Sequence, residues 1–221
     1  GYGISNDGVT AYMTLTSLVN TNDTLIVGVG VYPRVQSTSP LNFLSFNDGS
    51  VSGINCRIET ITGEVSAYRG STFLGGSSGA NVTFNRWHYI EVKVKVHRSA
   101  GTVEMRVGGR TVLLLNNVNT KAGTHDYYDK LWFHLHRYDY DDLYVADTLG
   151  SVNNDFLGNV RVVTLFPNGD GGTNQWTPSS GSDHYALVDE GAENDDTDYL
   201  ESGMSGDTDL WTFGDISGVG A

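Results

Sequence analysis

The sequence predicts an all-β protein in which two antiparallel sheets pack face to face. Apolar and polar residues alternate over many short runs, which is the pattern of strands with one buried and one solvent-facing side. The 221 residues include 28 Gly and four Pro, as expected for a chain that turns often. We find no convincing amphipathic helix. A sandwich of this length commonly forms one main domain.

The clearest strands lie between residues 87 and 115. Residues 88–96 and 103–107 each alternate strictly, and residues 112–115 continue the pattern. Gly108-Gly109 provides a two-residue connection that can adopt the positive φ angles of a tight hairpin. Three consecutive antiparallel strands with one polar face must lay the other face on a second layer. The rest of the chain is therefore expected to supply another sheet.

Shorter runs before and after this meander complete the predicted strands. Those before it are residues 11–18, 24–32, 41–46, 54–60 and 64–68, and those after it are residues 130–137, 142–146 and 159–166. The pair 54–60 and 64–68 is expected to form a hairpin across Thr62-Gly63. Residues 75–79 read as a Gly/Ser loop, because their G-x-S-x-G letters are not followed by the helix that a serine nucleophile requires. The single cysteine, Cys56, alternates with polar neighbours and is expected in the core.

The composition changes after Pro167. Residues 1–161 carry 13 Lys plus Arg against 14 Asp plus Glu, whereas residues 162–221 carry 12 acidic residues and no Lys or Arg. We therefore expect a sandwich domain at 1–166 and an extended acidic arm at 167–221, which packs on the domain or on a neighbouring subunit. An acidic chain without a basic patch disfavours nucleic-acid binding. No apolar run approaches the ~20 residues of a membrane span, so membrane insertion is not expected.

One polar and aromatic segment is the predicted ligand-binding site. Its residues are Trp132, His134, His136, Tyr138, Asp139 and Tyr140. His134 and His136 lie two apart on one strand and share a face, which is one way to bind a transition metal. The same residues also fit a face that contacts sugar or another subunit, and an ordinary solvated face. In the sugar-binding interpretation, the aromatic rings stack on sugar rings and Asp139 accepts hydrogen bonds from hydroxyl groups.

Calcium is the cation that the acidic residues favour, since it takes oxygen ligands from Asp, Asn and the backbone. The candidate ligands are Asp141, Asp142, Asp147 and Asp155. A second stretch, at Asn194, Asp196 and Asp198, resembles an EF-hand loop in its alternation. Tyr199 stands where that loop requires Gly, so an EF-hand is not expected. No cofactor is predicted to be required.

Glycoside hydrolysis by retention needs two carboxylates about 5 Å apart. Glucanases of the sandwich type carry them on one strand as Glu-x-Asp-x-(x)-Glu, and this spacing does not occur here. The nearest acidic cluster in a strand context is Asp139, Asp141 and Asp142. On this ground the sequence predicts that the chain is not an enzyme.

The order of several blocks resembles a known family. These blocks are WHYIEVKVKVH, GTVEMRVGGRTVL, DDLYVADTLGSVNNDFLGNVRVVTLFPN, QWTPSSGSDHYALVDE and NDDTDYLES. Together they are similar to bacteriophage virion proteins with a concanavalin A-like lectin/glucanase, or LamG-like, jelly roll. Similar proteins tend to extend beyond the equivalents of Gly1 and Ala221, which leaves a complete protein and a fragment as two readings.

The resemblance implies a jelly-roll fold and a place on the exterior of a virion. The expected function is that of a structural protein of a tail, fibre or capsid decoration, whose partners are other virion proteins and copies of itself. The alternative is an adhesin module that recognises glycans of the host surface.

Overall fold

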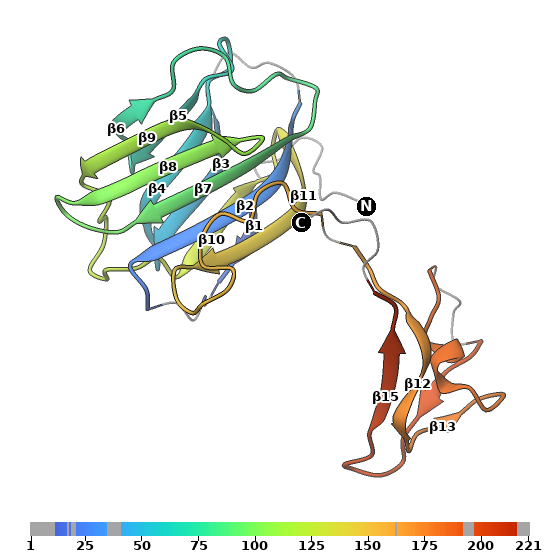
Figure 1. The fold of residues 1–221 in the computed structure, drawn as a ribbon. Helices are drawn as coiled ribbons and strands as arrows, with labels where there is room; N and C mark the ends of the chain where they lie inside the picture. Colours follow the sequence, from blue (N-terminus) through green and yellow to red (C-terminus); the bar gives the residue numbers. More distant parts are fainter. Residues whose placement is uncertain are drawn as a thin grey trace. The chain divides into compact units, whose positions relative to one another are not determined.

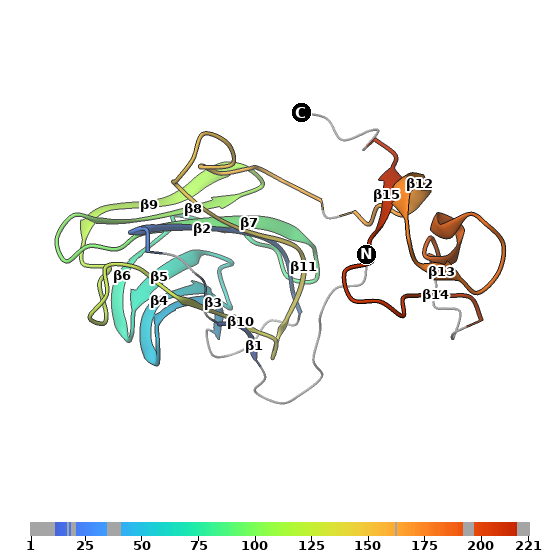
Figure 2. The ribbon, with the colours of Figure 1, turned by 90° about the horizontal axis from the view of Figure 1, so that it is seen from below.

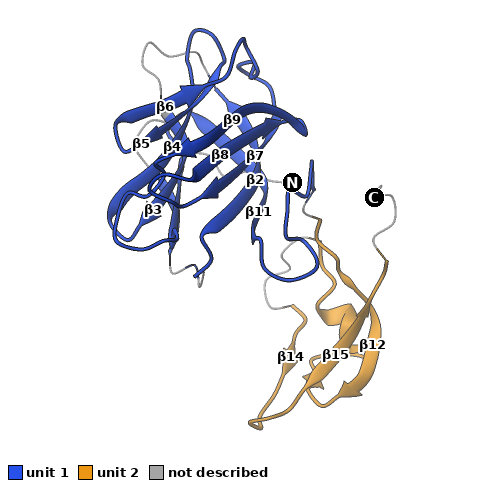
Figure 3. Cartoon of the chain, turned by 60° about the vertical axis from the view of Figure 1, so that its left-hand side comes forward, with its two compact units in different colours: residues 1–162 blue, residues 163–221 orange. Residues whose placement is uncertain are grey.

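The computed structural model describes residues 12–16, 18, 21–34, 41–161, 163–191 and 197–215. The chain divides into two compact units, Gly1–Val162 and Val163–Ala221 (Figure 3). This division lies beside the boundary expected between residues 166 and 167. Among the described residues, no helix is both long and apolar enough to cross a membrane.

The first unit is a sandwich of two antiparallel sheets, which confirms the predicted fold class (Figures 1 and 2). The six-stranded sheet has the order β1 (Tyr12–Leu15), β10 (Lys130–His134), β3 (Leu41–Asp48), β4 (Val51–Ile58), β5 (Val65–Arg69) and β6 (Thr72–Gly76). The five-stranded sheet has the order β11 (Tyr138–Asp147), β2 (Thr24–Pro33), β7 (His88–Lys95), β8 (Gly101–Val107) and β9 (Arg110–Val118). Strands that are neighbours in a sheet are therefore often far apart in the sequence.

The meander predicted between residues 87 and 115 is present as β7, β8 and β9. Val92 of β7 pairs with Met105 of β8, and Met105 pairs with Leu113 of β9. The hairpin between β8 and β9 turns through Gly108 and Gly109, whose φ angles of 56° and 76° lie in the region that favours glycine.

The core lies between the two sheets and is filled by the apolar side of each alternating run. Large members include Phe46, Phe133, Ile90 and Met105, all fully buried. Cys56 is also fully buried there, and burial raises the pKa of its thiol, because the thiolate would lose its hydration. The thiol is therefore a small apolar group of the core, as predicted.

Several predicted strand boundaries differ from the structure, and three of the differences concern whether a strand forms or where it ends. Residues 159–161 and 163–166 alternate but form no strand, and Val163, Leu165 and Phe166 are exposed. Residues 72–76, read in part as a loop, form the edge strand β6 against β5. The run predicted at 130–137 ends at His134. In each case the deciding factor is whether a partner strand is available, which alternation does not report.

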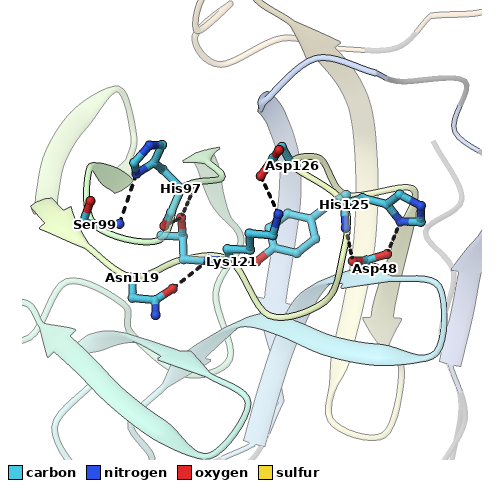
Figure 4. A network of polar contacts seen from close by, with 9 residues as sticks. Asp48, His97, Ser99, Asn119, Lys121, His125 and Asp126 are labelled. Atoms are coloured by element: carbon cyan, nitrogen blue, oxygen red, sulfur yellow. Dashed lines mark hydrogen bonds and ion pairs between the residues drawn. The ribbon is translucent and has the colours of Figure 1, made fainter.

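A connection from β9 to β10 carries the chain from one sheet to the other (Figure 4). The carboxylate of Asp48 faces His125, which donates its backbone N–H to Oδ2 at 3.0 Å and lies 2.5 Å from Oδ1 through Nδ1. Lys121 Nζ binds Asp126 Oδ1 at 2.6 Å. The backbone N–H of Asp129 donates to the carbonyl of Asn47 at 3.2 Å. These contacts fix the point at which β10 begins beside β3.

The second unit contains β12 (Pro167–Asn174), β13 (Thr177–Pro178), the 3₁₀ helix η1 (His184–Leu187), β14 (Leu200–Glu201) and β15 (Asp209–Phe213). β12 pairs with β15, and β13 pairs with β14. Asp209 joins these parts: it accepts the backbone N–H groups of Gln175 and Trp176 at 2.6 and 2.8 Å, and His184 Nδ1 lies 2.5 Å from its other oxygen. The expectation that this region packs on the sandwich or on a neighbouring subunit stays a prediction.

Candidate ligand-binding face

The outer face of the six-stranded sheet carries one continuous row of side chains across all six strands. The row follows from the pairing of the strands and consists of Thr14, Trp132, Ser45, Asn55, Tyr68 and Phe73, in the order β1, β10, β3, β4, β5 and β6. Because side chains alternate along a strand, these residues face away from the core that their neighbours fill. We call this set the cross-strand row. Five strand spacings of ~4.8 Å give it a span of about 24 Å.

Aromatic rings stand at both ends of the cross-strand row. At one end, the ring centroids of Tyr12 and Trp132 are 5.5 Å apart, and Tyr12 also contacts the ring of His134 at 4.8 Å. At the other end, Tyr68 and Phe73 meet edge to face at 5.3 Å, and Phe73 is 59% exposed. Both ends therefore offer flat apolar surface next to polar groups.

The centre of the row is a fixed chain of hydrogen bonds. Ser45 Oγ donates to Asn55 Oδ1 at 2.7 Å and lies 2.9 Å from His134 Nε2. Since the hydroxyl hydrogen of Ser45 is directed at Asn55, we assign the hydrogen of this second bond to His134 Nε2. Burial lowers the pKa of His134 to about 4, so the imidazole is neutral at neutral pH.

A second row lies beside the first, towards the β4–β5 end of the sheet. Arg57 Nε donates to Asn42 Oδ1 at 2.8 Å, and the guanidinium carbon lies 3.8 Å from the centroid of the Tyr68 ring. Ser66, the strand partner of Arg57, donates its hydroxyl to Glu59 Oε1 at 2.5 Å. A groove of about 680 Å³ opens next to them and is lined by residues that include Glu59, Ser66, Tyr68 and Phe73.

The structure places two of the predicted ligand-binding residues on this face. Trp132 belongs to the cross-strand row, and His134 follows it on the same side of β10. His136 lies beyond the end of β10, and its Nδ1 is buried without a hydrogen-bond partner in the described part of the chain.

The other predicted ligand-binding residues lie elsewhere, which is a correction. Tyr138 and Tyr140 are 4% and 3% exposed and belong to the core, where the Tyr140 hydroxyl donates to the carbonyl of Phe43 at 2.6 Å. The chain turns after His134 and enters the five-stranded sheet at Tyr138, so the alternation of β10 does not continue into β11. Asp139 forms an ion pair with Arg34 at 2.6 Å.

The predicted calcium ligands are not brought together. Asp141 Oδ1 accepts the backbone N–H of Asp142 at 2.8 Å, Asp147 Oδ1 accepts that of Leu149 at 2.8 Å, and Asp155 pairs with Lys93. Among the described residues, no three His, Cys, Asp or Glu side chains gather as a metal site. Asn194 and Asp196 of the second stretch lie outside the described residues. Calcium binding stays a prediction.

Sequence reasoning missed Ser45, Asn55, Arg57 and Tyr68 as functional candidates. A signal for two of them was present, because alternation in residues 54–60 puts Asn55 and Arg57 on the polar side of their strand. Their proximity to Trp132 depends on β3 pairing with both β4 and β10, which residue patterns do not reveal.

The outer face of the five-stranded sheet is covered instead. The segment after β11 crosses it on the side away from the six-stranded sheet (Figure 2). Glu91 Oε1 receives the Tyr144 hydroxyl at 2.6 Å and the backbone N–H of Gly158 at 2.8 Å. Phe156 lies under the guanidinium of Arg106 at 3.9 Å. The part of this face around Glu91, Lys93 and Arg106 is covered by the chain's own residues, whereas Leu114 on β9 stays exposed.

No protein-family model and no curated protein matches the sequence of this chain. Solved structures do resemble it in fold. Trypanosoma rangeli sialidase matches with a TM-score of 0.50 and 10% identity over 65% of this chain and 25% of the sialidase. An endo-β-1,4-glucuronan lyase from Trichoderma reesei has a TM-score of 0.44 and 14% identity over 65% of this chain and 78% of the lyase.

Caenorhabditis elegans galectin LEC-6 has a TM-score of 0.41 and 9% identity, over 65% of this chain and 94% of the galectin. At these identities the likeness concerns the fold. The first unit is a lectin-like jelly-roll sandwich, and the chain corresponds to only 25% of the sialidase's length.

The comparisons overturn the prediction that the chain is not an enzyme. Trypanosoma rangeli sialidase, which matches with a TM-score of 0.50, is an enzyme that contains a sandwich of this fold. The absence of Glu-x-Asp-x-(x)-Glu excluded one arrangement of carboxylates only, whereas sandwiches of this kind also occur in enzymes that the pattern does not describe. The prediction is withdrawn.

Proposed function

We propose that this chain binds carbohydrate on the outer face of the six-stranded sheet. The observation that carries the proposal is the cross-strand row, in which aromatic rings at both ends flank a hydrogen-bonded polar centre. Sugars present apolar C–H faces and many hydroxyl groups, so a site for them needs flat rings beside fixed polar groups. The outer face combines both, because the row supplies the rings and the adjacent groove supplies the polar groups of Ser66 and Glu59.

The residues of the face have distinct roles in this proposal. The half-exposed rings of Tyr12 and Phe73 and the partly exposed ring of Trp132 provide surfaces on which sugar rings stack. Ser45 and Asn55 are nearly buried and bonded to each other, so they support the face rather than contact the ligand. The groove beside Ser66 and Glu59 offers oxygen atoms that accept hydrogen bonds from sugar hydroxyls.

The test measures binding of the full chain on an array of neutral and charged glycans, followed by calorimetry with the strongest ligand. We expect Trp132→Ala to weaken binding at least about tenfold, because a stacked aromatic is commonly a dominant contact. Trp87→Ala is the matched control, since Trp87 is half exposed but packs on Tyr32 of the five-stranded sheet. Equal loss in both variants, or no binding to any glycan, contradicts the proposal.

Chromatography of the same mixtures after long incubation shows whether a bound glycan is also cleaved. New products that appear with the wild-type chain and disappear with Trp132→Ala place chemistry on the same face. Such products extend the proposal from binding to turnover.

We propose as the biological setting the exterior of a bacteriophage particle, where the chain acts as a structural component that contacts copies of itself and other virion proteins. The ordered sequence blocks support this setting. The acidic second unit supports it too, because neighbouring copies in a symmetric particle could contact this unit. Light scattering of the full chain tests the assembly. A multimer supports this role, and a monomer at every concentration contradicts it.

A further inference from the structure

The strands of the six-stranded sheet direct two cationic side chains outwards, while the groove beside them is lined by the carboxylates of Glu59 and Glu64. The sequence has 26 Asp plus Glu against 13 Lys plus Arg. By the alternation of β10, β3, β4 and β5, the charged side chains that these strands direct outwards are Lys130 and Arg57, and both are cationic. Asp48, at the end of β3, is directed at His125 in the connection instead.

Neither cation has a carboxylate partner among the residues that the structure describes. Elsewhere in the same sandwich, cations do pair: Arg34 with Asp139, Lys93 with Asp155, and Arg106 with Glu104. In all, five of the 13 Lys and Arg residues form such a pair in the described chain. An unpaired cation is therefore not unusual by itself, and what distinguishes Arg57 is the way in which its side chain is held on the candidate face.

The side chain of Arg57 is preorganised to bind an anionic ligand. Its Nε is fixed by Asn42 Oδ1, and its plane rests on the Tyr68 ring, so the side chain has little freedom left to lose on binding. Within the described residues, its two terminal amino groups have no hydrogen-bond partner. Two parallel N–H donors of one guanidinium match the two oxygens of a carboxylate.

Lys130 lies beside a second unsatisfied group. It pairs in register with Asn47, whose side chain is 1% exposed and whose amide nitrogen and oxygen both lack a partner in the described part of the chain. Buried amides are normally hydrogen-bonded, so a partner from water or ligand is expected there. Arg57 and Asn47 lie on the same outer face, on the neighbouring strands β4 and β3.

The carboxylate of Glu59 disfavours one orientation of a negatively charged ligand on this face. Its carboxylate accepts the Ser66 hydroxyl at the rim of the groove and repels a second anion there. A ligand therefore places its carboxylate on Arg57 and its hydroxyl groups towards Glu59.

We propose that this face binds glycans that carry carboxylate groups, with Arg57 as the principal anion contact and Lys130 as a second. This inference rests on the proposed carbohydrate-binding function and narrows its ligand class. The carboxylate comes from a hexuronic acid or from a sialic acid, and the experiment separates these two sources.

The experiment compares each acidic glycan with a neutral partner of the same backbone, by calorimetry on the full chain. One pair is oligogalacturonate and its methyl ester, and the other is sialyllactose and lactose. We expect the acidic member of one pair to bind roughly ten to a hundred times more tightly, as a charge-assisted hydrogen bond allows. The pair that shows the preference identifies the source of the carboxylate.

Three variants assign the preference to residues. Arg57→Gln should abolish the difference in affinity between the acidic and the neutral glycan. Arg57→Lys should restore only part of this difference, because lysine lacks the two parallel N–H donors, and Lys130→Gln should reduce it several-fold. Arg110→Gln, at the exposed start of β9, should leave it unchanged. Thermal unfolding of each variant controls for folding.

The outcomes separate this inference from the function on which it rests. Equal affinity for acidic and neutral members overturns the inference and leaves carbohydrate binding standing. A preference that survives Arg57→Gln also overturns it. Binding of no glycan at all overturns both.

Discussion

The two outer faces of the sandwich are built from the same alternating strands but differ in how their polar groups are satisfied. On the five-stranded sheet, Lys93, Arg106 and Glu91 all contact the segment that crosses the sheet or a neighbour on it. On the six-stranded sheet, Arg57 and Asn47 keep polar atoms without a partner in the described chain. Glu91 Oε2 is also buried without a partner in the described chain, so the faces do not differ in that respect alone. They differ in that the chain itself contacts Glu91, Lys93 and Arg106, whereas Arg57 presents fixed donors that no described residue accepts, which suits a ligand.

The difference also explains where glycine is required. Gly28 of β2 lies under the Tyr144 ring, and a Cβ at this position would come within 2.0 Å of Tyr144 Cε1. The ring reaches Glu91 only because Gly28 has no side chain. The covered face therefore depends on the close approach of the Tyr144 ring to the backbone at Gly28. The candidate face depends on polar groups that no described residue contacts.

The largest expected effect comes from breaking this close approach. Gly28→Val should displace Tyr144 and lower the free energy of unfolding by about 3 kcal/mol, because overpacking forces side chains and backbone to shift. Urea denaturation measures the loss. Gly76→Ala is the control, since its Cβ would make only an ordinary contact at 3.5 Å. Similar losses in both variants would show that the covered face is not the reason.

Removing the hydroxyl of Tyr144 should have a smaller effect on the same face. This hydroxyl donates to Glu91 and accepts the backbone N–H of Leu157 at 3.1 Å. Tyr144→Phe should therefore cost about 1–2 kcal/mol of unfolding free energy, together with faster amide hydrogen exchange at Leu157 and Gly158. Glycan binding should not change, and a loss of binding would mean that the covered face is part of the ligand site.

A pH dependence distinguishes the candidate face from the rest. The folded-state pKa of His134 is about 4, below its ordinary value of 6.5, because burial disfavours the charged imidazole. Between these values the unfolded chain binds a proton that the folded chain does not, so stability falls as the pH falls from 6.5 to 4. His134→Gln should flatten this part of the profile of urea midpoint against pH. Identical slopes in wild type and variant contradict the assignment.

The acidic groups should act in a lower pH range. Burial is the largest single effect on the pKa of Asp48 and raises it. The hydrogen bonds and the charge interaction with His125 together outweigh burial, so the pKa lies below 3.8. Asp48 therefore stabilises the folded chain at any pH above the pKa that it has in the unfolded chain. This stabilisation is lost as the pH falls from that value through the lower pKa of the folded chain. Asp48→Asn should therefore remove part of the loss of stability seen in strong acid and leave the pH range of His134 unchanged.

The smallest expected effect is that of calcium. The predicted calcium ligands contact other groups of the chain and would first have to be brought together, so we expect millimolar calcium to raise Tm by no more than about 1 °C relative to chelator. Differential scanning calorimetry with and without EDTA measures this. A larger shift would place a calcium site in the chain and return the acidic loops to consideration.

The candidate site was only partly predictable. Trp132 and His134 were found because they alternate with Leu131 and Phe133, which are core residues. The same rule failed at Tyr138 and Tyr140, because alternation holds only while the strand stays in one sheet. The turn after His134 carries the chain into the other sheet, and the two tyrosines become part of the core.

By itself the sequence determined the class of fold, the meander of β7, β8 and β9, and the burial of Cys56, since these follow from local alternation and turn residues. Only the tertiary structure decided which strands are neighbours. Residues 14, 45, 55, 68, 73 and 132 became one row through hydrogen bonding between strands distant in sequence. The physical reason is that alternation is a property of one strand, whereas register is a property of pairs.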